Sequence, residues 1–83
     1  MKKTDTGKSH DLILDLPTGS VKHVRRTLLK LSTTLQVDEG APYHQDPLIS
    51  QLRIQTLWTK EKLEAWCYNT KGVDYIGVAE SSS

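Results

Sequence analysis

Five aliphatic side chains between Ser20 and Val37 recur at steps of three and four residues, the spacing of one face of an α-helix. They are Val21, Val24, Leu28, Leu31 and Leu35. At about 100° per residue they fall within about 80° of one another and form a narrow apolar stripe. Ser20 suits the start of this helix, because a serine oxygen can accept from the free amides of the first turn. A stripe this narrow needs a second surface to cover it, so the sequence predicts a helix over residues 20–37 that organises the fold.

The segment before this helix alternates between two sets of side chains, which is typical of a half-buried β-strand. Leu12, Leu14 and Leu16 point one way, and Asp11, Ile13 and Asp15 point the other. Pro17, Thr18 and Gly19 follow and end the pattern. We therefore predict a strand over residues 10–16 and a turn that leads into the helix.

The second half of the chain fits two structures. After a loop over residues 38–46, the favoured one is a β-meander with strands at 53–59, 63–68 and 73–79, because alternation and a turn at 69–72 match hairpin geometry. In the alternative, Pro47 begins a short helix and Thr59 caps a second one. The strand at 73–79 is common to both.

These patterns predict an α+β fold in which one long amphipathic helix packs on an antiparallel sheet in the order β-α-β-β-β. The alternative is a mostly helical fold with a small two-stranded sheet. A chain of 83 residues has room for one core. We expect a flexible N-terminal arm at residues 1–9, one globular domain at 10–79 and a disordered tail at 80–83.

Several classes of function find no support in the sequence. No apolar run reaches the roughly 20 residues that span a bilayer, and the first residues do not resemble a signal peptide. Cys67 is the single cysteine, which excludes an internal disulfide. The three histidines have neither the spacing of a metal site nor a catalytic partner. We therefore expect a cytoplasmic protein that is not an enzyme and uses no metal or cofactor.

The charge distribution gives the strongest functional indication. Residues 1–30 carry seven Lys/Arg against three Asp, a net charge of +4 in a chain whose total is +1. On the predicted helix, four cations lie off the apolar stripe: Lys22, Arg25, Arg26 and Lys30. Such a row can follow a phosphate backbone. The first hypothesis is a small non-enzymatic binding module, with nucleic acid as the first candidate partner and an acidic protein surface as the second.

A second hypothesis concerns the aromatic residues. In the meander, Trp66, Tyr68 and Tyr75 lie on the sheet face that the helix leaves uncovered. Exposed aromatic patches tend to mark interaction surfaces. This predicts a protein-interaction module or regulatory adaptor, with a homodimer as one form of it.

Overall fold

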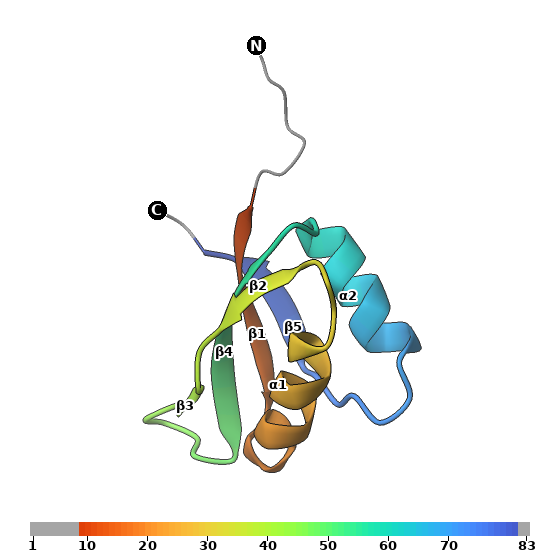
Figure 1. Ribbon diagram of the computed structural model, residues 1–83. Coiled ribbons are helices and arrows are strands. Elements are labelled where there is room, and N and C mark those ends of the chain that lie inside the picture. The colour runs from red at the N-terminus through yellow and green to blue at the C-terminus, as the bar shows by residue number, and fades with distance from the viewer. Residues whose placement is uncertain (1–8, 82–83) are drawn as a thin grey trace.

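The computed structural model describes residues 9–81, and strands and helices follow one another along this stretch (Figure 1). In chain order they are strand β1 (His10–Pro17), the 3-10 turn η1 (Thr18–Ser20), helix α1 (Val21–Leu29), strands β2 (Thr34–Val37), β3 (Ala41–Pro42) and β4 (Ile49–Thr56), helix α2 (Lys60–Asn69) and strand β5 (Gly77–Glu80). The α+β class is confirmed, but two short helices replace the single long one. Residues 1–8 of the predicted arm lie outside the described residues.

The strands form one five-stranded antiparallel sheet in the order β2-β4-β1-β5, with β3 also paired to β4. The two long strands, β1 and β4, occupy the centre and pair from His10↔Thr56 to Pro17↔Ile49. Since β2 and β3 pair with the same edge of β4, they act as one interrupted strand. The chain then has the βαββαβ order of the split βαβ arrangement. The mostly helical alternative is wrong.

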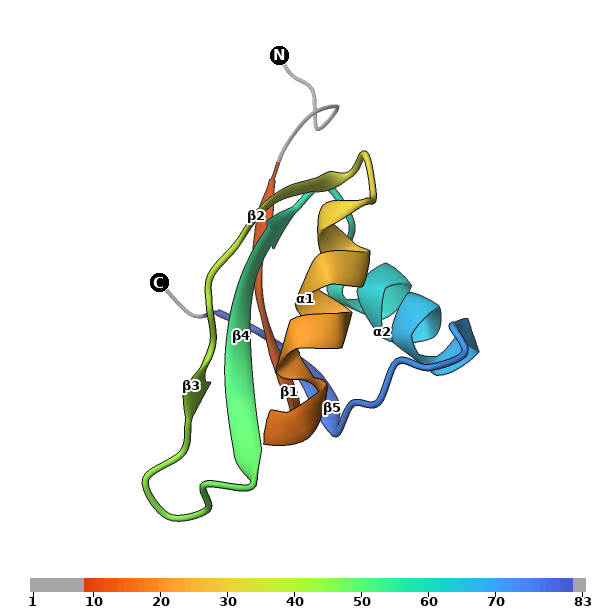
Figure 2. The same ribbon diagram turned by 60° about the horizontal axis from the view of Figure 1, so that its bottom comes forward.

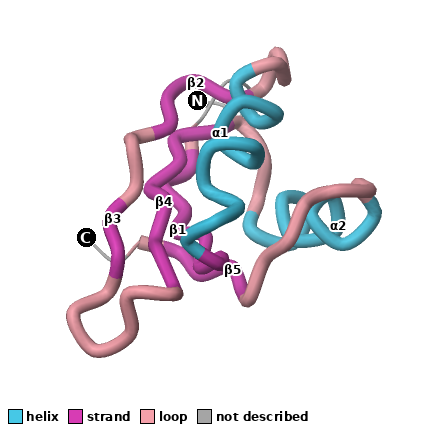
Figure 3. Tube along the Cα trace, turned by 90° about the horizontal axis from the view of Figure 1, so that it is seen from below, coloured by secondary structure: helices cyan, strands magenta, loops and turns pink. Residues whose placement is uncertain are grey.

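Both helices lie on the same face of the sheet (Figure 2). Helix α1 packs over β2 and β4, whereas α2 lies to the side, against β5 (Figure 3). The alternation of β1 decides which side chains the helices cover. Leu12, Leu14 and Leu16 are buried beneath them, as predicted, while Ile13 and Asp15 belong to the opposite face. We call that opposite face the open sheet face.

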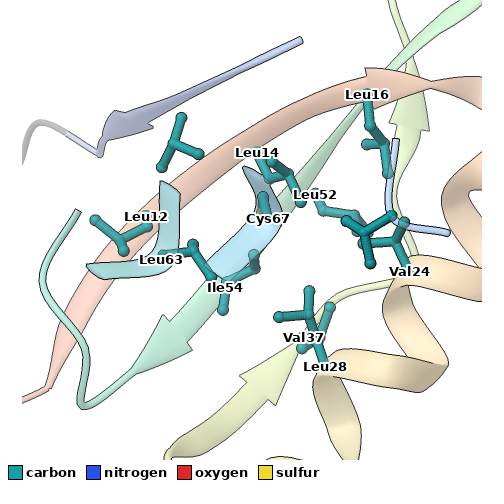
Figure 4. Close-up of a cluster of buried hydrophobic side chains, with 12 residues drawn as sticks. Leu12, Leu14, Leu16, Val24, Leu28, Val37, Leu52, Ile54, Leu63 and Cys67 are labelled. Carbon is teal, nitrogen blue, oxygen red and sulfur yellow. The ribbon is translucent and has the colours of Figure 1, made fainter. Parts of the chain in front are cut away.

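The core fills the space between the sheet and the two helices (Figure 4). Val24 and Leu28 enter it from α1, and Leu63 and Cys67 enter it from α2. From the sheet come Leu12, Leu14, Leu16, Val37, Leu52, Ile54 and Val78. Burying one such side chain contributes about 1.5–3 kcal/mol. These contacts therefore fix the rotation of each helix and the side chains it turns outward.

Only the first part of the helix predicted over residues 20–37 forms. Helix α1 ends at Leu29, and the last predicted residues form β2, where the Leu35 side chain is 52 % exposed. Ser32–Thr34 is a run of poor helix formers, because hydroxyl groups compete for the backbone and β-branched side chains are restricted in a helix. Leu31 and Leu35 continued the apolar spacing, but pairing with β4 takes the chain away from the helix axis.

The favoured meander is wrong for residues 63–68, which lie in α2. The side chain of Thr59 accepts a hydrogen bond from the amide of Lys62 over 3.3 Å, so the helical alternative was right for this segment. That same alternative placed a helix after Pro47, where β4 instead begins at Ile49. Residues 53–56 of the predicted strand 53–59 do lie in β4.

The last strand is displaced from its predicted position at 73–79. Val73 is buried, but it lies in the loop after Gly72, which has a φ of +88°. Strand β5 covers Gly77–Glu80, and the amide of Ser81 donates to the carbonyl of Asp11. Two residues of the predicted disordered tail are therefore part of the ordered domain.

Candidate binding surface on helix α1

Helix α1 is fixed at its start by residues distant in the sequence. The amide of Thr18 donates to the carbonyl of Leu48 over 2.8 Å, and its hydroxyl donates to that of Pro47 over 2.7 Å. Ser20 does not cap the helix as predicted, since its hydroxyl donates to Asp74 over 3.3 Å instead. These bonds join η1, the turn that leads directly into α1, to the loops that precede β4 and β5, so the helix is a firm base for a surface site.

Three of the four predicted cations form an exposed row, which we call the basic face: Lys22, Arg26 and Lys30. Lys22 and Arg26 are one helical turn apart, and Lys30 is the C-cap residue. Because Val24 and Leu28 are anchored in the core, the helix turns these cations toward solvent. Within residues 9–81 none of the three makes a side-chain hydrogen bond or an ion pair.

Arg25 has a different role from the other three. Its side chain is half-buried, its Nε donates to the carbonyl of Asp38 over 2.8 Å, and its Nη2 donates to that of Val37 over 3.3 Å. The guanidinium thereby ties α1 to the end of β2. Two of its five N–H groups are used in this way, and three remain for a partner. The sequence grouped Arg25 with the other three cations and did not reveal this tether.

A groove of about 600 Å³ runs between α1 and the loop after β2. We call it the α1 groove, and its lining residues are Val21, Lys22, Arg25, Arg26, Leu29 and Glu39. The aliphatic residues are Val21 and Leu29, and the Leu29 side chain is 48 % exposed. The lining therefore combines three cations, one carboxylate and two apolar side chains.

Gly40 holds the loop wall of the α1 groove close to the helix. It adopts a φ of +82°, and a Cβ added there would lie 3.1 Å from Leu52 Cδ2 and 3.2 Å from Val21 Cγ1. The carboxylate of Asp38 accepts from the amides of Gly40 and Arg53, over 3.0 and 3.1 Å. A larger residue could not follow this path without displacing its neighbours. The backbone on both sides of Glu39 is therefore fixed.

The predicted aromatic sheet face does not form. Trp66 and Tyr68 lie on α2, and Tyr75 lies in the loop before β5. Trp66 packs against the core and against Trp58, with ring centroids 6.2 Å apart. Tyr68 is the exposed member, at 79 %. The error follows from the meander, because a helix spaces residues 66 and 68 differently from a strand.

The open sheet face is mainly polar. Its central side chains are Asp11, Ile13 and Asp15 of β1 and Gln51, Arg53 and Gln55 of β4. The Tyr43 hydroxyl donates to the Asp15 carboxylate, and this hydrogen bond, together with burial, raises the pKa of Tyr43. Strands β1, β2, β4 and β5 contribute no Phe, Trp or Tyr side chain, and Tyr43, which follows β3, contacts this face through Asp15.

Cys67 is a core residue with little reactivity. Its side chain is 1 % exposed, and burial, with a smaller contribution from Glu64, raises the pKa of the thiol to about 11. The thiolate is the nucleophilic form, so at neutral pH the side chain is a protonated, buried thiol. Among residues 9–81, no three His, Cys, Asp or Glu side chains gather in a geometry that could hold a metal ion.

Sequence reasoning missed the α1 groove because its loop wall depends on where α1 ends. Glu39 enters the site only because the chain turns into β2 directly after the helix. Leu29 is the lining residue that the sequence could have indicated, since it is an aliphatic residue outside the apolar stripe.

Comparisons with models of known protein families, with curated proteins and with solved structures found no match. None of the helices within residues 9–81 has the length and apolar character needed to cross a bilayer. The split βαβ arrangement supports many unrelated functions, so the fold alone does not indicate which function this protein has.

Proposed function

We propose that this protein is a small binding module that holds an anionic macromolecule against helix α1. The observation that carries the proposal is the basic face: Lys22, Arg26 and Lys30 are exposed in one row on a helix anchored by the core. Arg25 adds a fourth positive charge beside that row. A row of fixed cations attracts an anionic polymer and releases the counterions that the polymer had condensed.

Nucleic acid is the first partner to test, because the effect of salt on its binding can be calculated. Three phosphate contacts from the basic face give a log–log slope of affinity against salt of about −3 on duplex DNA. Binding should be weak at physiological salt and insensitive to base sequence, since phosphate contacts carry no sequence information. Replacing Lys22, Arg26 and Lys30 together with Ala should flatten the slope by about three. Fluorescence anisotropy with a labelled duplex measures both quantities.

A charge-matched control removes three cations from a different surface. Lys60, Lys62 and Lys71 belong to α2 and the turn after it, so replacing them with Ala changes net charge equally and spares the basic face. We expect this control to retain most of the slope. Equal loss in both triple variants would show that only net charge matters. Absence of any binding to duplex DNA and to polyglutamate at low salt would refute the proposed function.

A further inference from the structure

We infer that the α1 groove takes an acidic peptide segment that carries an apolar side chain beside its carboxylates. This inference rests on the proposed function and names the class of partner for the same site. It comes from the composition of the groove, because a phosphate backbone makes no favourable contact with the apolar side chains or the carboxylate in the lining.

The apolar part of the groove is the first argument. Leu29 directly follows the core residue Leu28, but its side chain lies outside the buried cluster and is 48 % exposed. Val21, which lies two helical turns before Leu29 on the same side of α1, is half-buried. A partner that covers Leu29 removes apolar surface from water, which is favourable in proportion to the area covered. A phosphate group gains nothing from this contact, whereas an aliphatic side chain does.

The arrangement of charges is the second argument. Arg25 is held in place by the carbonyls of Val37 and Asp38, so its remaining N–H groups are oriented before a partner arrives. A planar guanidinium matches the geometry of a carboxylate. Lys22 and Arg26 provide further positive charge, and the single carboxylate of Glu39 leaves the groove net positive.

Glu39 also discriminates between the two polyanions. Each strand of a duplex carries one phosphate per about 3.4 Å of helix axis, so a backbone laid in the groove would bring a phosphate near this carboxylate. A peptide can place a backbone N–H or an uncharged side chain there instead. The groove volume of about 600 Å³ suits a few side chains of a peptide.

The test compares two labelled acidic peptides that differ in one residue. Both consist of glutamates around a central position, which is Leu in one peptide and Ser in the other. The Leu peptide should bind about fivefold to tenfold more tightly, as expected for covering a half-exposed leucine. That advantage should disappear in Leu29→Gln. It should persist in Leu48→Gln, a matched control because Leu48 is 77 % exposed in the loop before β4.

Amide shift mapping supplies a readout that does not depend on a variant. Titration with the Leu peptide should shift the amides of Leu29 and Gly40 and leave those of α2 unchanged. Equal affinity for both peptides, or shifts confined to α2, would overturn the inference. If duplex DNA still binds through the basic face in that case, the proposed function stands without it. If neither peptide nor DNA binds at low salt, both fail.

Discussion

At the scale of single residues, Gly40 shows how one backbone position controls the candidate site. Its positive φ lies in a region where a side chain costs about 1–2 kcal/mol, and its close contacts leave little room for a Cβ. We predict that Gly40→Ala lowers the free energy of unfolding by about 1–3 kcal/mol, as measured by urea denaturation. Gly19→Ala is the matched control, since nothing lies within 4 Å of a Cβ there and its φ is not positive. Equal losses in the two variants would count against this account.

Cys67 is the residue that should give the fold a measurable pH dependence. Its thiol has a pKa of about 11 in the folded state against an ordinary value of 9.0. A raised pKa means that the folded state favours the protonated thiol. The stabilisation is therefore complete below pH 9 and is lost as the pH rises toward 11, by about 2–3 kcal/mol.

The Cys67→Ala variant isolates this contribution from the tyrosines that ionise in the same range. The variant is less stable throughout, because it leaves a small cavity. The test is the slope of unfolding free energy between pH 9 and pH 11, which should be shallower in Cys67→Ala than in the wild type. Identical slopes would show that the thiol does not titrate as proposed.

At the scale of elements, the contact between α1 and β2 depends on Arg25. The neighbouring Arg26 is exposed on the same helix and makes no such contact within the described chain, so the pair forms an internal control. We predict that Arg25→Ala costs about 1–3 kcal/mol of unfolding free energy, since two carbonyls lose a charged donor. Arg26→Ala should cost less than about 0.5 kcal/mol. Denaturant unfolding of both variants tests this, and a larger effect at Arg26 would contradict it.

The elements also show how much of the fold could be read from the sequence. Strand β1 could be predicted because its three leucines occur at every second position, and all three are buried under the helices. The end of α1 was not, because Leu31 and Leu35 kept the helical spacing by coincidence while pairing with β4 decided the structure. For α2, the cap at Thr59 was visible, but the same residues also alternated. Local patterns of this kind leave a choice that only long-range packing resolves.

Some residues of the candidate site could likewise be predicted from the sequence, and others could not. Lys22, Arg26 and Lys30 could be predicted because they lie opposite the buried residues of one helix. The tether of Arg25 and the position of Glu39 could not, since both depend on the loop that follows β2. The predicted aromatic sheet face was wrong together with the strand on which it depended, because Trp66 packs against the core from α2.

At the scale of the whole molecule, one core serves a sheet that is covered on one face only. Leu14 lies in the central strand, is fully buried, and belongs to the cluster that both helices share. Ile13 precedes it on the open sheet face and is partly exposed. Removing the Leu14 side chain should therefore weaken both helices and the sheet together, whereas trimming Ile13 should act only locally.

We predict that Leu14→Ala costs about 3–5 kcal/mol and Ile13→Ala about 1 kcal/mol. For a domain of this size, the Leu14 variant should melt about 15–30 °C lower. The near-ultraviolet circular dichroism of Trp66 in α2 and of Trp58 just before it, and the far-ultraviolet dichroism of the whole chain, should change in one transition. Separate transitions would mean that α2, which lies beside β5, unfolds on its own. In that case the basic face would remain folded with α1 while the α2 side of the molecule is lost.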